Sequence, residues 1–334
     1  MLRLPARAGL RPMALYTVLS SEQIADAIRS FGLPAPDRVQ PEPKGSVNTN
    51  YHLWTGGERW FLRLNEGKTD ADVRFEAEVQ RYLHEARFPV ARLRLAADGR
   101  PWVPVEGKQA MLFAYAAGEE ISRDAAGPER CRRVGEQLGR LHELASGFVP
   151  ERRNPYAPER VRGWISELRP DGGGDADVRA ALPMLDDELA RADRLPGAPR
   201  GLVHGDLFID NVLWIGDRVG AVLDWEMSCV DPFAYDLGVA VNAWCYVDRY
   251  DPARAAALLA GYRSRRRLEP ETADALYPWA RYAALRFTAS RIHAFHRAAL
   301  GADRLAWKDW RRYRDRLAAL RDMGEGGFRA LLGV

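Results

Sequence analysis

Residues 202–237 read LVHGDLFIDNVLWIGDRVGAVLDWEMSCVDPFAYDL, and they are the most informative stretch of the chain. The stretch contains two apolar runs, VLW and VGAVL, separated by the short polar break IGDR. A glycine in such a break between apolar runs predicts a β-hairpin. Because a hairpin brings its two outer ends side by side, Asn211 and Asp224 are expected to lie close together, with Asp206 nearby.

These three side chains suit phosphoryl transfer from ATP. Mg²⁺ on the phosphates takes oxygen ligands, usually one or two carboxylates together with phosphates and waters. Asp224 and the amide oxygen of Asn211 are therefore the predicted Mg²⁺ ligands. A further carboxylate must accept or align the proton of the attacking hydroxyl, and Asp206 is the candidate for this catalytic role. The alternative is a surface hairpin with capping acids.

The stretch resembles the catalytic and metal-binding loops of the protein-kinase-like phosphotransferases, in particular the aminoglycoside phosphotransferase and choline kinase group. The resemblance is carried by HGDL at 204–207, Asn211, DWE at 224–226 and the later acids Asp231 and Asp236. It implies an α+β, two-lobed protein-kinase-like fold with ATP and Mg²⁺ as cofactors bound at a cleft. The N-terminal lobe is expected to hold an antiparallel sheet with a helix, and the C-terminal lobe to be mainly helical with the catalytic hairpin.

The chain of 334 residues is long enough for two modest domains. We expect a nucleotide-binding lobe over 13–115 and a catalytic and substrate lobe over 116–334, with the boundary at Ala116-Ala117-Gly118. Residues 1–12 contain three arginines and no acid. They are interpreted as an N-terminal extension before Met13, with an organelle transit peptide as the alternative.

Composition excludes several classes of protein. The net charge is only +3, so no nucleic-acid partner is indicated, and the RSRRR run at 263–267 is interpreted as a solvated helix end. No apolar run approaches the ~20 residues of a membrane span. Three cysteines without CxxC spacing argue for a reducing, cytoplasmic location. The expected assembly is a monomer or homodimer that acts on a small molecule.

In the N-terminal lobe, the small polar residues of GSVNTN precede a strand, and such residues let backbone N–H groups approach phosphates. Ser46 and Asn48 are therefore predicted to bind the cofactor. After a Gly-Gly turn, the strand WFLRL returns, and Arg63 points to the opposite face from its leucine neighbours. The resemblance assigns this position to the cation that binds the phosphates, where the family usually has lysine. The alternative for Arg63 is an exposed strand arginine.

The apolar period predicts a helix over 70–87, in which Glu76 and Glu78 flank the apolar stripe on opposite sides. One of them is expected to pair with Arg63, as a helix glutamate does in kinases. The period alone does not choose between them, and the resemblance favours Glu76.

Two other features of this lobe concern nucleotide binding. Gly67-Lys68-Thr69 ends like a P-loop, but Leu62 stands where the required glycine would be, so this motif is rejected. The strand at 109–115 is expected to lead into the hinge. The resemblance implies that its backbone around Phe113 and Tyr115 contacts adenine.

In the C-terminal lobe, a helix is predicted over 128–144, with small residues in LGRLH that suggest close helix packing. His142 is interpreted as a packed structural histidine. Asp236 precedes a helical run and is expected to cap it. The resemblance implies that an acid at this place supports the catalytic loop. Three further helices are predicted over 251–262, 271–296 and 303–321.

The narrower resemblance is to the homoserine kinases of this fold, which phosphorylate the side-chain hydroxyl of homoserine. It rests on MALYTV, NTNY, DLFxDNVL, YDL and VNxWC, starting at Met13. The chain departs from that family at Gly205, Glu226 and Arg63. Other acceptors therefore stay open: an aminoglycoside, choline or ethanolamine, or methylthioribose. An inactive nucleotide-binding pseudokinase is the alternative from another class.

Homoserine carries a carboxylate and an ammonium group. Arg286 or Arg291 is predicted to hold the carboxylate, and Glu226 the ammonium. The alternative for both arginines is an ion pair within the domain.

Overall fold

The computed structural model describes residues 17–42, 47–168, 175–297 and 309–334. The chain divides into two compact units. Unit 1 consists of the residues up to Ala77 with Ala91–Tyr115, and unit 2 of Glu78–Val90 with Ala116–Val334. The predicted α+β class is confirmed, with an antiparallel sheet in the N-terminal part and a mainly helical C-terminal part. The predicted domain division after Tyr115 stays a prediction.

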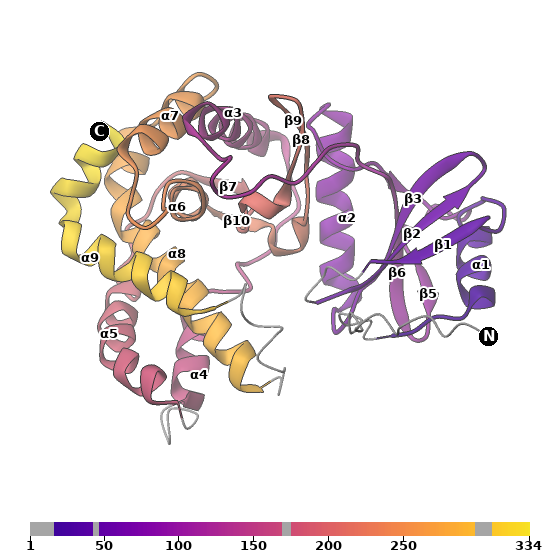
Figure 1. Cartoon of the computed structure of the whole chain (residues 1–334), viewed down its shortest axis with the longest axis horizontal. Helices are drawn as coiled ribbons and strands as arrows, with labels where there is room; N and C mark the ends of the chain where they lie inside the picture. Colours follow the sequence, from indigo (N-terminus) through magenta and orange to yellow (C-terminus); the bar gives the residue numbers. More distant parts are fainter. Residues whose placement is uncertain (1–16, 43–46, 169–174, 298–308) are drawn as a thin grey trace, which may run out of the picture. The chain divides into compact units, whose positions relative to one another are not determined.

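The helices and strands are labelled in Figure 1. In chain order they are α1 (Ser21–Ser30), β1 (Arg38–Pro41), β2 (Thr49–Thr55), β3 (Glu58–Leu64), α2 (Asp70–Glu85), β4 (Leu93–Arg94), β5 (Val103–Val105), β6 (Lys108–Ala114), α3 (Pro128–Leu144), η1 (Ala145–Gly147), α4 (Pro158–Leu168), α5 (Ala176–Ala192), β7 (Arg200–Val203), η3 (Ile209–Asn211), β8 (Val212–Ile215), β9 (Arg218–Val222), η4 (Trp225–Met227), β10 (Cys229–Pro232), α6 (Phe233–Trp244), α7 (Pro252–Arg263), α8 (Pro270–Arg297) and α9 (Arg311–Leu332).

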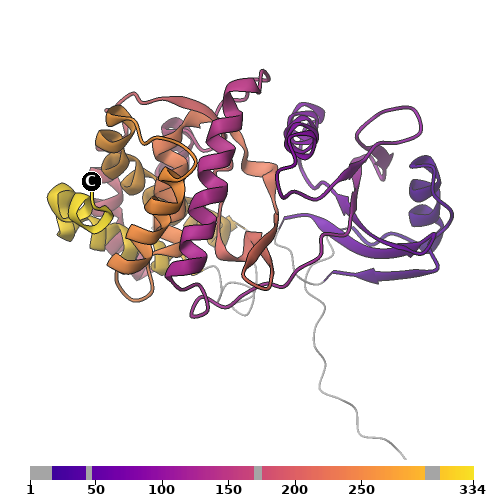
Figure 2. The ribbon, with the colours of Figure 1, turned by 90° about the horizontal axis from the view of Figure 1, so that it is seen from above.

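Unit 1 is built on one antiparallel sheet with the strand order β1-β2-β3-β6-β4, and β5 also pairs with β6. Ile24 and Ile28 of α1 pack with Leu62 in one buried cluster. Val73 of α2 packs with Met111 in another. Figure 2 shows both helices alongside the sheet. Because side chains alternate along β3, the strand contributes to both clusters.

Helix α1 begins with the predicted capping box. The Ser20 hydroxyl accepts a hydrogen bond from the Gln23 N–H at 3.1 Å. The Gln23 side chain in turn accepts one from the Ser20 N–H at 2.7 Å. The two residues therefore satisfy donors that the first turn leaves without an intrahelical partner.

Unit 2 is arranged around α6, whose twelve residues are all buried. Helices α3, α7 and α8 pack against it, as Figure 1 shows. The close packing expected from LGRLH is confirmed, because a Cβ on Gly139 of α3 would lie 2.6 Å from the Tyr262 carbonyl oxygen of α7. Two more glycines bring these helices close together. A Cβ on Gly135 would lie 1.9 Å from the carbonyl oxygen of Leu258, and one on Gly261 would lie 2.0 Å from that of Arg132. No side chain fits at either glycine without moving a backbone.

The predicted hairpin is confirmed as β8 and β9, with Val212 paired to Val222. The turn contains Gly216 at φ +60°, a conformation that glycine adopts without strain. A second short antiparallel pair joins β7 to β10. In the described part of the chain, no helix combines the length and apolar character needed to cross a bilayer.

The prediction for the last helix is wrong at its end. The pattern predicts a stop at Arg321, but α9 continues to Leu332 across a kink at Gly324. Phe328 and Leu332 of the last turns are buried, so packing maintains a helix that the local glycines disfavour. Of the predicted start, residues 303–308 lie outside the described residues.

Candidate functional site

Asp206 lies in the loop that leaves β7, with Asn211 five residues later. The Asn211 Nδ2 group donates a hydrogen bond to the Asp206 carbonyl oxygen at 2.7 Å and lies 3.3 Å from Asp206 Oδ2. Gly205 makes the turn possible, because it has φ +74° and a Cβ there would lie 3.0 Å from the Met227 carbonyl oxygen. The predicted proximity of Asp206 and Asn211 is confirmed.

The hairpin also joins Asn211 to the segment that carries Asp224. The Leu223 N–H donates to the Asn211 carbonyl oxygen at 2.8 Å, so Asp224 directly follows a residue paired with Asn211. Asp224 adopts φ 62° and ψ 65°, a left-handed conformation that Asp and Asn tolerate better than most residues. This conformation turns the chain from β9 into η4.

His204, to which sequence reasoning assigned no role, connects the two loops. Its Nδ1 accepts from the Asp206 N–H at 3.2 Å, and its Nε2–H donates to the Leu223 carbonyl oxygen at 2.9 Å. A ring with one acceptor and one donor nitrogen is a neutral imidazole. The ring also packs against Trp225, with centroids 4.5 Å apart. One side chain therefore fixes the segments of Asp206 and Asp224.

The fully buried carboxylate of Asp236 supports this loop. It accepts hydrogen bonds from the backbone N–H groups of His204 and Gly205, each at 2.8 Å. Burial opposes the charged form, but hydrogen bonds from His142 and His204 outweigh it and hold the Asp236 pKa below its ordinary value. The predicted cap is wrong: α6 begins at Phe233, so Asp236 already lies in its first turn and its oxygens meet the loop instead.

His142 completes this support. Burial lowers its pKa, so the ring is neutral. Its Nε2 lies 3.2 Å from Asp236 Oδ2, and its Nδ1 lies 3.1 Å from the Tyr262 hydroxyl. The prediction of a packed structural histidine is confirmed.

Arg286 of α8 brings a buried positive charge next to Asp206. Its Nη1 lies 3.9 Å from Asp206 Oδ1, and its guanidinium lies 3.8 Å from the ring centroids of both Tyr156 and Phe287. Within the described residues, Nε and Nη2 have no hydrogen-bond partner. Burial alone would lower the pKa of Arg286, but Tyr235, Tyr156 and Asp206 raise it above the ordinary value. The group is therefore charged.

The other predicted substrate residues are in the same unit. The Arg291 guanidinium lies 4.5 Å from the Tyr313 ring centroid. Burial lowers its pKa, whereas Tyr313 and Asp206 act in the opposite direction. Glu226 is buried in η4. Because both arginines interact electrostatically with Asp206, the surroundings of this carboxylate are cationic.

Tyr156 lies among these charged groups, although no sequence pattern singled it out. Burial raises the pKa of its phenol. Arg286 acts against this rise, while Glu226 and Asp206 add to it. All four side chains are therefore electrostatic neighbours within unit 2.

In unit 1, Arg63 forms the predicted ion pair with Glu76, and both side chains are buried. Glu78 is only partly buried, so the structure resolves the alternative in favour of Glu76. Burial opposes ionisation of Glu76, but Arg63 and Lys68 lower its pKa to about 2. Whether these residues bind nucleotide stays a prediction.

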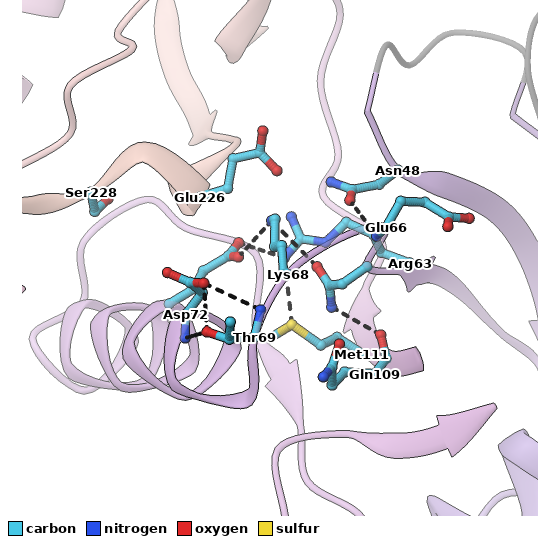
Figure 3. Close-up of polar contacts among 12 residues, drawn as sticks. Asn48, Arg63, Glu66, Lys68, Thr69, Asp72, Gln109, Met111, Glu226 and Ser228 are labelled. Atoms are coloured by element: carbon cyan, nitrogen blue, oxygen red, sulfur yellow. Dashed lines mark hydrogen bonds and ion pairs between the residues drawn. The ribbon is translucent and has the colours of Figure 1, made fainter. Parts of the chain in front are cut away.

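Lys68 is the residue of this cluster that sequence reasoning missed. Its Nζ lies 3.5 Å from Glu76 Oε2 and 3.4 Å from Asn65 Oδ1. Figure 3 shows Lys68 beside Arg63, in the segment that leads into α2. Gly67-Lys68-Thr69 is not a P-loop, but a lysine just before the helix of Glu76 is a usable signal in the sequence.

The remaining nucleotide-binding residues stay predictions, and the structure shows only their surroundings. Asn48 Oδ1 accepts from the Glu66 N–H at 3.2 Å, so it joins two loops of unit 1 (Figure 3). The Phe113 ring lies 5.1 Å from the Arg63 guanidinium carbon and supports that side chain. Ser46 lies outside the described residues.

The backbone N–H of Tyr115, which is predicted to lie near adenine, already has a hydrogen-bond partner. It donates to the Arg59 carbonyl oxygen at 3.1 Å, and the Tyr115 ring lies 3.6 Å from the Arg59 guanidinium carbon. With this hydrogen bond in place, a backbone hydrogen bond from Tyr115 to adenine would have to use its carbonyl group.

The donor set fits Mg²⁺ rather than a dedicated protein cage. The described part of the chain contains no group of three or more His, Cys, Asp or Glu side chains that would hold a metal. Asn211 turns its Nδ2 to Asp206, and no hydrogen bond reaches its Oδ1 from any described residue. That oxygen and the Asp224 carboxylate are of the hard type that Mg²⁺ prefers beside phosphates and waters, so these two residues would hold the ion.

Comparison with known proteins places the chain among kinases of small molecules. The sequence profile of the phosphotransferase enzyme family matches residues 38–271. Homoserine kinase of Phenylobacterium zucineum is 33% identical over 301 residues, covering 87% of this chain and 90% of the relative. Homoserine kinase of Sinorhizobium fredii is 31% identical over 301 residues, covering 87% and 89%.

Solved structures share the fold at lower identity. A microcompartment-associated aminopropanol kinase has a TM-score of 0.68 at 18% identity, covering 91% of this chain and 97% of its own. A spectinomycin phosphotransferase in complex with ADP and spectinomycin has a TM-score of 0.65 at 12% identity, covering 90% and 95%. The predicted kinase-like fold is confirmed by these matches.

Proposed function

Because the chain belongs to the phosphotransferase enzyme family, we propose that it is an ATP- and Mg²⁺-dependent kinase that phosphorylates the side-chain hydroxyl of homoserine. The relatives described above support the choice of acceptor. The observation in the molecule that carries it is the buried guanidinium of Arg286, 3.9 Å from the carboxylate of Asp206.

A cationic neighbourhood around the catalytic acid favours an acceptor that carries an anionic group. A buried positive charge raises the free energy of binding another cation and lowers that of binding a carboxylate. Arg286 has two nitrogens without hydrogen-bond partners among the described residues. A carboxylate would satisfy such donors, and a guanidinium binds it in bidentate fashion. Arg291 is the second candidate for this contact, and Glu226 is the candidate for the ammonium of homoserine.

The same neighbourhood disfavours the rival acceptors. Choline needs an aromatic or acidic cage for its cation. Here Arg286 itself lies between the rings of Tyr156 and Phe287, so the protein's own cation uses these rings. Aminoglycosides carry several positive charges and would be repelled by the two arginines.

In the proposed reaction, Asp206 accepts or aligns the proton of the acceptor hydroxyl. His204 and Asp236 hold the Asp206 loop by hydrogen bonds, so the carboxylate is positioned before substrate binds. Asn211 and Asp224 would hold Mg²⁺, which neutralises charge on the phosphates when bound. The presence and ordered support of these side chains favour an active kinase over a pseudokinase.

Unit 1 would bind the nucleotide. The cationic groups held by Glu76 are assigned to the phosphates, and the backbone at Phe113 and Tyr115 to adenine. Two solved structures with this fold are complexes with nucleotides, an amicoumacin kinase with AMP-PNP and a spectinomycin phosphotransferase with ADP. This supports ATP as the donor.

The test is a coupled assay of ADP release with Mg²⁺-ATP and four acceptors: L-homoserine, its methyl ester, choline and an aminoglycoside. Homoserine should give the highest kcat/KM, with O-phosphohomoserine identified by ³¹P NMR and mass spectrometry. The methyl ester, which lacks the carboxylate charge, should be a much poorer acceptor.

Two results would contradict the proposal. Preferred phosphorylation of choline or the aminoglycoside would move the acceptor to another class. Absence of ADP release with every acceptor, although the nucleotide binds, would favour the pseudokinase.

A further inference from the structure

We infer that Lys68 binds the nucleotide phosphates, and that Arg63 positions Glu76. This inference rests on the proposed function and deepens it, because it names a phosphate-binding residue outside the strand where the cation was expected. The two cations share one carboxylate: Arg63 contacts Glu76 Oε1 and Lys68 contacts Glu76 Oε2.

Arg63 is contacted on several sides by residues of α2 and of the neighbouring strand β6. Its Nη2 donates to Glu76 and lies 3.4 Å from the sulfur of Met111. Its guanidinium lies over the Phe113 ring, and β3 pairs Arg63 with Met111 of β6. A planar guanidinium fixed by a carboxylate, a thioether and an aromatic ring is suited to orient Glu76.

Lys68 is held differently. Its Nζ lies at 3.5 Å and 3.4 Å from two oxygens, which are long contacts for an ammonium group. One of them, Asn65 Oδ1, is fixed because Asn65 donates from Nδ2 to the Gln109 carbonyl oxygen at 3.0 Å. An ammonium group also carries three rotatable donors on a flexible stem, so it can contact phosphate oxygens while it stays beside Glu76.

Hydrogen bonds next to Lys68 also fix the position of its backbone. Thr69 and Asp72 hydrogen-bond to each other at the first turn of α2, with the Asp72 N–H donating to the Thr69 hydroxyl at 3.2 Å (Figure 3). Lys68 therefore directly precedes a first helical turn that is fixed by hydrogen bonds. An ammonium beside a helix glutamate is the arrangement by which kinases bind nucleotide phosphates. In this chain the lysine comes from the loop after β3, because Arg63 takes the strand position.

The composition of the chain makes this inference testable by direct labelling. Of the 49 lysine and arginine residues, four are lysines: Lys44, Lys68, Lys108 and Lys308. An acyl phosphate of ATP transfers its acyl group to an amine that lies near the bound phosphates and releases ATP. Arginine does not react in this way, so mass spectrometry of the labelled protein distinguishes Lys68 from Arg63.

Lys68 should be the lysine that is acylated, and excess Mg²⁺-ATP should suppress the label. Lys108 is the matched internal control, because it lies in the same unit and also forms an ion pair, with Glu66. The Lys108 side chain is 31% exposed and that of Lys68 only 14%, so labelling by accessibility alone would favour Lys108.

Kinetics give a second readout. Lys68→Met should raise KM for ATP about 10- to 100-fold, the loss expected for a charge-assisted hydrogen bond, and should leave KM for the acceptor unchanged. Lys68→Arg should recover part of the ATP affinity. If Lys68→Met fails to fold, labelling of the wild-type protein still shows whether Lys68 lies near the bound phosphates.

The outcomes separate this inference from the function on which it rests. ATP turnover with a Lys68 that is not labelled, together with an unchanged KM for ATP in Lys68→Met, would overturn the role of Lys68 alone. Absence of any nucleotide-protected label and of any nucleotide binding would overturn both.

Discussion

The carboxylate of Asp236 accepts a hydrogen bond from the backbone N–H of His204 at 2.8 Å, although 32 residues separate them in the sequence. The same carboxylate holds the Gly205 N–H and contacts His142, and His204 in turn contacts the segments of Asp206 and Asp224. A single buried acid of α6 therefore fixes the loop that carries the proposed catalytic residue.

Replacing this acid should destabilise unit 2. In Asp236→Asn, one oxygen becomes an NH₂ group that cannot accept from a backbone N–H or from His142. Buried donors left unsatisfied, with the loss of hydrogen bonds to a charged acceptor, cost about 2–4 kcal/mol. Urea denaturation at pH 8 measures this loss.

Asp231→Asn is the matched control for Asp236→Asn, since it makes the same change at another acid of the same unit. Burial raises the Asp231 pKa to about 6, so its folded state favours the neutral form. That contribution is complete below the unfolded pKa of about 4 and is lost as the pH rises through 6. At pH 8 the neutral amide should therefore not lower stability. Equal losses in the two variants would contradict the specific role of Asp236.

The role of Asp206 is tested by Asp206→Asn. A positioned base contributes about 10²–10⁴-fold to turnover, so kcat should fall by that factor with little change in ATP affinity. The backbone carbonyl that accepts from Asn211 is retained in this variant, so the loop should keep its fold. Steady-state kinetics with isothermal titration of ATP measure both quantities. Wild-type turnover would remove Asp206 from its proposed role.

Asp224 is best tested by two substitutions. Both Asp224→Asn and Asp224→Ala remove the carboxylate proposed to bind Mg²⁺, but asparagine tolerates the left-handed backbone at φ 62° and alanine is strained there. Both variants should lose Mg²⁺-dependent activity, and the alanine variant should also be less stable. Activity is titrated against Mg²⁺ beside thermal unfolding. An unchanged Mg²⁺ response in the asparagine variant would exclude the ligand role.

Glu76 predicts a specific dependence of stability on pH. Its pKa is held at about 2, below the ordinary 4.5, so its carboxylate stabilises the folded state above pH 4.5. This contribution, about 3 kcal/mol, should disappear as the pH falls from 4.5 towards 2. Glu76→Gln should therefore be much less stable than the wild type at pH 7, and the difference should shrink at pH 3.

Urea midpoints at both pH values check the Glu76 prediction, with Glu78→Gln as the control. Glu78 lies on the same helix and is only partly buried, so its replacement should change little at either pH. Similar pH profiles for the two variants would contradict the role of the buried ion pair.

Arg286 and Arg291 are compared by their effect on the acceptor. If Arg286 holds the carboxylate of homoserine, Arg286→Gln should raise KM for homoserine about 10- to 100-fold with KM for ATP unchanged. If Arg286 only positions Asp206, kcat should fall instead. Arg291→Gln is measured in parallel. Unchanged KM for homoserine in both variants would rule out the proposed carboxylate contact.

The elements with local signals could be predicted from the amino-acid sequence. The polar break between two apolar runs indicated the β8–β9 hairpin, and Ser20 with Gln23 indicated the start of α1. Alternation along β3 placed Arg63 on the face away from Leu62, where it meets Glu76. These features follow from hydrogen bonds and periodicity within a few residues, so neighbouring residues are sufficient to predict them.

The meeting of distant groups, by contrast, became visible in the folded chain alone. There the His204 ring joins the segments of Asp206 and Asp224, and Arg286 lies beside Asp206. Helix α9 also continues past Gly324, because Phe328 and Leu332 are buried. Burial and long-range hydrogen bonds outweigh local propensities in these cases, and neither can be read from the residues that flank each site.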